Sequence, residues 1–152
     1  MVTDPFDLRI LRLVQTDSQM TIKEIAKHVH LSLTPVHERL RKLEREGLIE
    51  RYVALLNRKK LGKTLMVYCH VTLDKQRKES FEEFDTAIQT MPEILECSLV
   101  SGNFDYLLKV VANDVEDYNR FYQQKLSVLQ SVLHISSFFV MSEVKATTCL
   151  PI

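Results

Sequence analysis

The sequence predicts an α+β protein, with an N-terminal winged-type helix-turn-helix domain followed by a C-terminal ferredoxin-like βαββαβ domain. Two helix starts lie eleven residues apart, at Thr21 and Ser32, and beyond residue 60 the apolar spacing alternates between strand and helix periods. Charge divides the chain as well, since residues 1–60 contain 12 Lys or Arg against 8 Asp or Glu, and residues 61–152 contain 8 against 12. We therefore expect a basic domain over 1–60, which ends in a linker strand, and an acidic domain over 61–152.

The first helix is expected to begin at Asp4. Asp4 is a favourable N-cap, and Pro5 fits the first helical position, where a missing N–H breaks no intrahelical bond. A second helix should start at Thr21, which can form a capping box with Glu24. Its apolar residues, spaced to bury one side, are Ile22, Ile25, Ala26 and Val29.

The third helix is expected to run from Ser32 to Gly47. Ser32 is a good N-cap, and Pro35 still falls within the first turn. So few residues separate this helix from the one before it that the two should cross at a steep angle, as in a helix-turn-helix. The connecting turn contains no glycine, and His30 is therefore expected to adopt the positive φ that such a turn needs.

One face of the third helix is expected to read DNA. Its apolar stripe leaves the opposite side polar, and Arg41 is the best candidate for a base contact because a guanidinium can bond guanine O6 and N7 together. Arg39, Lys42 and Arg45 suit phosphates better. A solvated charged helix would show the same pattern, and this alternative stays open for each residue taken singly. The candidate DNA-binding residues are Ser32, Thr34, His37, Glu38, Arg39, Arg41, Lys42 and Arg45.

After the third helix, the run LIERYVALLN at residues 48–57 alternates partly between apolar and polar positions. This pattern predicts a strand, which would either link the two domains or form a wing beside the DNA duplex.

The second domain is expected to contain four strands and two helices in the order β-α-β-β-α-β. Pro92 should end the first of these helices, and Asp114 should cap the second. The order predicts an antiparallel sheet with both helices on one face, and a second subunit is the simplest cover for the other face. The expected strands are 65–73, 94–100, 104–112 and 132–144, and the first helix is 78–90. The apolar residues assigned to the uncovered face are Val71, Leu73, Leu108, Val110, Phe138 and Val140.

Several classes of protein are not expected. No stretch is apolar for long enough to span a membrane, and the first residues lack the features of a secretory signal, so we expect a cytoplasmic protein with no membrane partner. The three cysteines lie far apart without a C-x-x-C pair, and no compact cluster of ligands suggests a metal site. Catalysis is not expected either, because Cys69 and His70 are adjacent on a strand and point to opposite faces.

Six short motifs follow one another along the chain. Each is weak alone, but together and in this order they are a strong signal. They are D-x-x-D-x-x-I-L from Asp4, L-S-x-T-P-V from Leu31, K-L-E-x-x-G-x-I from Lys42, Y-x-A-L-L-N from Tyr52, V-S-G-x-F-D-Y-L-L-K from Val100 and V-M-x-E-V-K from Val140. Through these motifs the whole chain resembles the Lrp/AsnC family, also called feast/famine regulators.

The resemblance implies a transcriptional regulator that binds double-stranded DNA and often a free amino acid, with no cofactor. It also implies homodimers that assemble into tetramers or octamers, in which paired recognition helices would lie about 34 Å apart and enter successive major grooves. The implied effector site lies at the hairpin turn, where dimers meet. Its candidate residues are Gly102, Asn103, Phe104 and Asp105.

In this implied site Asp105 would accept the effector's ammonium group, and Gly102 would let the backbone expose an N–H to its carboxylate. Leucine-type members often carry an acid where this chain has Asn103, so the identity of the ligand does not carry over. Two alternatives stay open. The turn could be a plain hairpin that Asp105 stabilises, or the protein could be an effector-independent oligomer of the same architecture that bends or wraps DNA.

Overall fold

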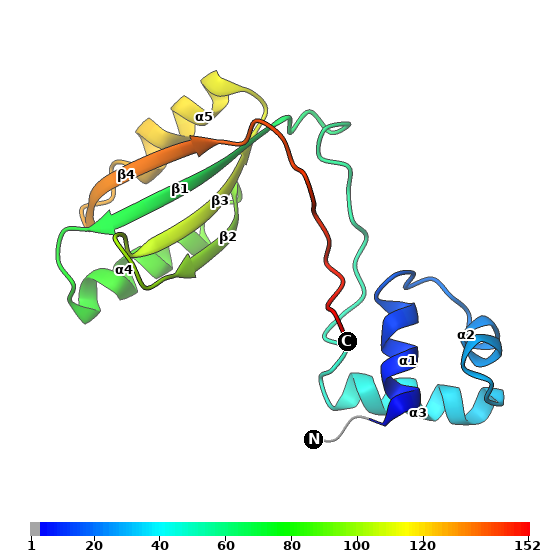
Figure 1. Ribbon diagram of the computed structural model, residues 1–152. Coiled ribbons are helices and arrows are strands. Elements are labelled where there is room, and N and C mark those ends of the chain that lie inside the picture. The colour runs from blue at the N-terminus through cyan, green and yellow to red at the C-terminus, as the bar shows by residue number, and fades with distance from the viewer. Residues whose placement is uncertain (1–3) are drawn as a thin grey trace. The chain divides into compact units, whose positions relative to one another are not determined.

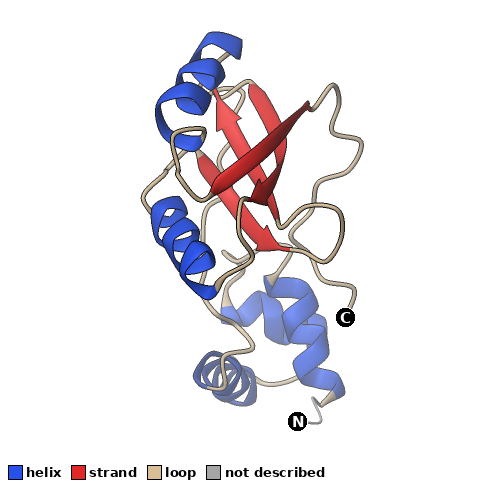
Figure 2. Cartoon of the chain, turned by 90° about the vertical axis from the view of Figure 1, so that its left-hand side faces the viewer, coloured by secondary structure: helices blue, strands red, loops and turns tan. Residues whose placement is uncertain are grey.

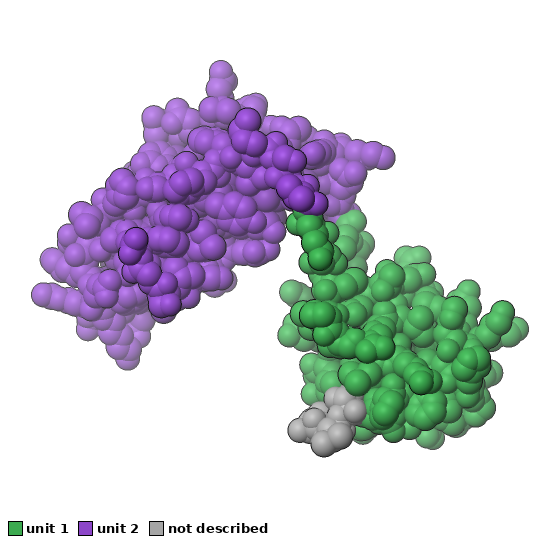
Figure 3. Space-filling view, in the orientation of Figure 1, with its two compact units in different colours: residues 1–55, 145–152 green, residues 56–144 purple. Residues whose placement is uncertain are grey.

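The computed structural model describes residues 4–152 and divides into two compact units (Figure 1). Unit 1 comprises the chain up to Leu55 together with Lys145–Ile152, and unit 2 comprises Leu56–Val144 (Figure 3). The second unit therefore begins a few residues before the expected boundary at residue 60. The C-terminal tail, which was expected in the second domain, packs on the first unit instead.

Gln15 holds this tail on unit 1. Its Nε2 donates to the carbonyl of Leu150 at 3.0 Å, and its Oε1 accepts from the N–H of Leu150 at 2.9 Å. A side-chain amide can satisfy both main-chain groups of one residue in this way. No local pattern in the sequence predicts this contact, because 135 residues separate the two partners.

Unit 1 contains three helices that begin at the residues expected from their caps. Asp4 accepts a hydrogen bond from the N–H of Phe6 at 2.6 Å, and Thr21 and Glu24 make both bonds of the capping box. Ser32 is the N-cap of the third helix as expected, but its hydroxyl caps no backbone N–H. The helices are α1 (Pro5–Val14), α2 (Ile22–Val29) and α3 (Leu33–Arg45).

The three helices share one small apolar core. Its members come from all three helices, at the positions that helical periodicity predicts. A core of this size needs every one of these residues, since small domains bury a low fraction of their surface. The buried residues are Ile10, Ile25, Ala26, Val29, Val36 and Leu43.

The turn between α2 and α3 passes through a left-handed residue, as predicted. His30 has φ 56° and ψ 45°, and it is the one non-glycine residue with positive φ in the described part of the chain. Its N–H and that of Leu31 both donate to the carbonyl of Ala26, which closes the end of α2. This geometry fixes the direction in which α3 leaves the turn.

Replacing His30 by glycine is expected to stabilise unit 1 by about 0.5–1 kcal/mol, because glycine adopts positive φ without the clash of a Cβ. The control His28→Gly lies inside α2 and should lower stability instead. Differential scanning calorimetry of the full chain measures both changes. A lower transition temperature for His30→Gly would show that the His30 side chain stabilises unit 1 by more than its positive φ destabilises it.

The strand predicted over residues 48–57 is absent. Residues 50–57 form neither helix nor strand, and several of their apolar side chains are exposed, such as Leu55 at 74% and Leu56 at 73%. A strand needs a neighbouring strand for its N–H and C=O groups, and within residues 4–152 no segment pairs with this one. Partial alternation in sequence was therefore not enough to make a strand.

Unit 2 is a four-stranded antiparallel sheet in the order β2-β3-β1-β4, with two helical segments. Asp114 is the N-cap of the second helix, as expected, and its carboxylate accepts a hydrogen bond from the N–H of Asp117. The elements are β1 (Leu65–Leu73), α4 (Lys78–Gln89), β2 (Ile94–Leu99), β3 (Tyr106–Ala112), α5 (Val115–Phe121), the π-helical turn η1 (Tyr122–Leu126) and β4 (Val132–Phe139). They follow the predicted order, and the arrangement is the ferredoxin-like one.

Both helices of unit 2 cover the same face of the sheet (Figure 2). Every second side chain of β1 points toward them, and Val67, Cys69 and Val71 are fully buried. Phe84 of α4 and Leu126 of η1 fill the core from the helical side. Within unit 2, residues 56–144, no helix covers the other face of the sheet.

The predicted apolar patch on the uncovered face is wrong in four of its six members, which lie in the core under the helices. Alternation shows which residues of a strand share a face, but not which face the helices will cover. Phe138 does lie on the uncovered face, where it is 50% exposed and pairs with Tyr68. The four misplaced residues are Val71, Leu73, Leu108 and Val110.

The last strand is shorter than the predicted 132–144. β4 ends at Phe139, and the N–H of Val140 makes the final bond to the sheet, to the carbonyl of Met66. Its partner β1 begins at Leu65, so later residues have no strand to pair with.

Cys69 is buried in the core of unit 2, where its Sγ lies 3.2 Å from Oη of Tyr118, and burial raises the pKa of its thiol. Cys97 and Cys149 are exposed. Within residues 4–152 no three His, Cys, Asp or Glu side chains gather as a candidate metal site. No helix in the same range is long and apolar enough to cross a membrane.

Candidate nucleic-acid interface and effector turn

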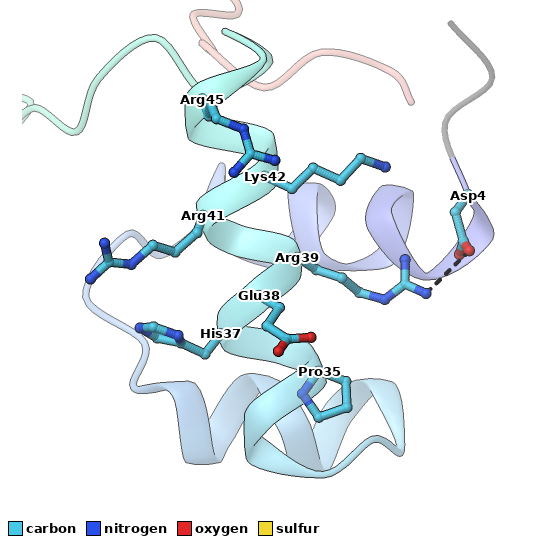
Figure 4. A pocket seen from close by; sticks show the side chains of 8 residues that line it. All are labelled: Asp4, Pro35, His37, Glu38, Arg39, Arg41, Lys42 and Arg45. Carbon is cyan, nitrogen blue, oxygen red and sulfur yellow. Dashed lines mark hydrogen bonds and ion pairs between the residues drawn. The ribbon is translucent and has the colours of Figure 1, made fainter.

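One face of α3 presents polar side chains to solvent (Figure 4). Val36 and Leu43 are buried against the other helices, which turns the opposite side of α3 outward. Arg41 and His37 project from the same side of the helix, and Arg41 has no ion-pair partner among the described residues. A guanidinium without a partner is available to a phosphate or a base edge.

Arg39 and Lys42 instead join α3 to α1. The Arg39 guanidinium donates to Asp7 at 2.6 Å and to Asp4 at 3.2 Å, and Nζ of Lys42 lies 3.4 Å from the other oxygen of Asp7. The hydrogen bond to Asp7 raises the pKa of Arg39. Since the Asp7 side chain is only 1% exposed, these partners replace the contacts with water that its carboxylate loses on burial.

The structure thus separates the eight predicted DNA-binding residues into two groups. Arg39 and Lys42, with side chains 27% and 43% exposed, hold two helices together. Asp7 was missed as their partner, although the acids at the N-cap and in the first turn of α1 are three residues apart, like the two bases on α3. Leu33, in the first turn of α3, is exposed as well, which the apolar pattern did not predict. The six that are exposed on α3 and its N-cap are Ser32, Thr34, His37, Glu38, Arg41 and Arg45.

The turn between β2 and β3 is closed by its own backbone. The N–H of Val100 donates to the carbonyl of Asp105 at 2.9 Å, and the N–H of Asp105 donates to Val71 at 2.9 Å. Asp105 is 8% exposed, and its carboxylate accepts hydrogen bonds from the N–H of Leu73 and from the Gln76 side chain, both at 2.7 Å. Asp105 therefore ties the turn to the loop that leads into α4.

Above Asp105, the turn exposes unbonded backbone donors. The N–H groups of Gly102, Asn103 and Phe104 have no acceptor anywhere in residues 4–152. A Cβ added at Gly102, where φ is 156°, would meet no atom within 4 Å, so the space over the turn is open. Successive free N–H groups beside open space can donate to a carboxylate.

Phe104 connects this turn to the uncovered face of the sheet. Its ring stacks on His70 with a centroid distance of 3.7 Å and an interplanar angle of 10°. The His70 ring lies in turn 4.5 Å from that of Phe138. The turn and the uncovered face therefore share one aromatic cluster.

A helix-turn-helix with a free, partly basic helix face, joined to a second unit with an open donor turn, defines a DNA-binding regulator with its own ligand-binding unit. Comparison with known proteins agrees. The family model for winged helix-turn-helix DNA-binding matches residues 3–50, and the Lrp/AsnC ligand binding domain matches residues 66–150. The chain belongs to the Lrp/AsnC family, whose members are transcriptional regulators and not enzymes.

Curated relatives share 42% of their residues with this chain. One is the proline dehydrogenase transcriptional activator of Rhizobium radiobacter, matched over 95% of this chain and 92% of the relative. Another is the leucine-responsive regulatory protein of Escherichia coli, matched over 98% and 91%. Among solved structures, a transcriptional regulator from Neisseria meningitidis in complex with L-Met is 31% identical with a TM-score of 0.95, over 99% of this chain and 97% of that one.

Proposed function

We propose that this protein is a sequence-specific transcriptional regulator of the cytoplasm, in which α3 reads DNA and the β2–β3 turn binds a free amino acid. The observation that carries the proposal is the outward face of α3, where Arg41 lacks any partner in the described chain. Unit 1 would supply the DNA contacts, and unit 2 would supply effector binding and assembly.

On the DNA side, Arg41 is assigned to a base edge in the major groove and Arg45 to a phosphate. Thr34, His37 and Glu38 are further candidates for base contacts, because all three are exposed on the same helix. The side chain of Lys42 is 43% exposed, but its Nζ lies next to Asp7. It can therefore reach a phosphate only by loosening that contact.

On the effector side, the free N–H groups of Gly102, Asn103 and Phe104 are assigned to the ligand's carboxylate. Asp105 is less free than the sequence suggested, since each of its oxygens already accepts a hydrogen bond. Its proposed part is to position the turn and, through remaining lone pairs, to attract the ammonium group. The names of the relatives make leucine, methionine and proline the first amino acids to try.

Assembly is part of the proposal, and we assign the uncovered sheet face to contact with a second copy. The face carries Phe138, 50% exposed, in one aromatic cluster with His70 and Phe104. An effector that repositions the turn would therefore act on the same side chains that meet the partner, which couples binding to assembly. Two copies of unit 1 would also double the modest positive charge offered to DNA.

Replacing Phe138 by aspartate is expected to break the assembly into monomers, because an unpaired carboxylate would be buried at the contact. Val128, 60% exposed outside the strands, provides the matched control Val128→Asp. Sedimentation equilibrium gives the masses. If Phe138→Asp keeps the mass of the unchanged protein, the sheet face is not the interface.

The effector part is tested by calorimetry and sedimentation of the full chain with leucine, methionine and proline, each added singly. We expect one of them to bind and to shift the assembly. Asn103→Pro removes one N–H from the turn and should weaken that response, whereas Asn103→Ala keeps the N–H and should retain it. No heat and no shift with any amino acid would favour the effector-independent DNA-organising role instead.

A further inference from the structure

Leu33 is an exposed apolar residue at the first position of α3. It is 54% exposed, whereas the other large apolar side chains of α1, α2 and α3 are buried or partly buried. Among the described residues of these helices, none of the others is an exposed large hydrophobic. The apolar pattern of the sequence gave no reason to place Leu33 outside the core.

Leu33 lies at the edge of the outward face of α3. It is about one helical turn before His37 and two before Arg41, next to the apolar stripe of the helix. It also lies in the first turn, and the N-terminal residues of a recognition helix are those that contact base edges. A duplex read by Arg41 would therefore meet Leu33 as well.

The surroundings of Leu33 do not suit a protein partner. Ser32, Thr34 and His37 around it are polar or ionisable and exposed, so Leu33 is a single apolar group and not part of a patch. It also cannot bond a phosphate. The one apolar feature that base edges offer in the major groove is the C5-methyl group of thymine.

We propose that Leu33 recognises a thymine by packing against its C5-methyl group in the major groove. The proposal rests on the proposed function, since it requires α3 to read DNA. It adds an apolar specificity contact to the polar ones of Arg41 and its neighbours, and it predicts a thymine at a fixed position in each half-site.

The test replaces thymine by deoxyuridine, which lacks only the methyl group. A duplex is first selected from a random-sequence pool with the full-length protein, and each thymine is then exchanged singly for deoxyuridine. We expect that, at one position in each half-site, the exchange lowers the affinity of the unchanged protein roughly three- to sixfold. This is the effect of removing one buried methyl group. Leu33→Ala should bind the thymine duplex more weakly by a similar factor and be indifferent to the exchange at that position.

Two further variants serve as controls. Leu33→Met keeps an apolar side chain and should keep the sensitivity to the exchange, and Val53→Ala truncates another exposed residue of unit 1, 59% exposed, and should behave like the unchanged protein. The proposal is overturned if the unchanged protein tolerates deoxyuridine everywhere, or if Leu33→Ala retains its sensitivity. Failure to enrich any sequence from the pool would instead contradict the proposed function.

Discussion

Replacing Asp7 by alanine is expected to destabilise unit 1 by about 2–3 kcal/mol, less than the roughly 3–5 kcal/mol for breaking a fully buried ion pair. Asp7 is 1% exposed and faces Arg39 at 2.6 Å and Lys42 at 3.4 Å. Its loss leaves two cations side by side without a counter-charge. The effect falls short of a fully buried pair because Arg39 and Lys42 still reach solvent, at 27% and 43% side-chain exposure.

Hydrogen exchange resolved by peptide is the measurement for Asp7→Ala, because it reports the two units separately. Amides of α1 and α3 should exchange roughly 30- to 150-fold faster, since each 1.4 kcal/mol corresponds to a factor of ten. Amides of β1 should not change. The control Glu46→Ala removes an exposed acid at the end of α3 and should leave both regions unchanged. Unaltered exchange in α1 and α3 of the Asp7 variant would mean that the ion pairs add nothing to stability.

The second large effect is expected for Arg41→Ala, which should lower affinity for the selected duplex by roughly 5- to 150-fold, the value of about 1–3 kcal/mol for a bidentate base contact. Arg41 is the exposed guanidinium on α3 nearest to His37 and Leu33 by helical spacing, and it has no partner in the described chain. Affinity for random-sequence DNA should fall much less, because phosphate charge dominates there.

Arg41→Lys separates the two kinds of contact. Lysine keeps the charge but loses the planar fork, so it should restore binding to random DNA and not to the selected duplex. Arg45→Ala, as a phosphate contact, should weaken binding to both duplexes alike and reduce the salt dependence. Titrations at several salt concentrations give the affinity for the selected duplex, the affinity for random DNA and the salt dependence of each variant. Full recovery of specific binding by Arg41→Lys would reassign Arg41 to a phosphate.

Local signals in the sequence predicted most of the secondary structure. The caps at Asp4, Thr21 and Asp114 act on backbone groups within three residues, so the chain around them carries the whole cause. The positive φ of His30 also has a local cause. The turn between α2 and α3 is so short that it needs a left-handed residue at this position. The β-α-β-β-α-β order follows from switches of hydrophobic period, which are also local.

The candidate sites were predictable only in part. Periodicity identified the outward face of α3, because its apolar stripe reveals the opposite side. It could not show that Arg39 and Lys42 turn back to Asp7, because that contact spans more than 30 residues of sequence. The hairpin motif indicated only the candidate effector turn, and the bonds that occupy Asp105 come from residues about 30 positions earlier.

Sequence alone was therefore sufficient for the order of elements, their caps, the left-handed turn at His30 and the outward face of α3, since each depends on neighbours within one or two helical turns. Tertiary structure decided which face of the sheet the helices cover, the place of the C-terminal tail on Gln15 and the absence of a strand at residues 50–57. Those features depend on segments that meet only after folding. A strand in particular needs a partner segment that bonds its backbone N–H and C=O groups.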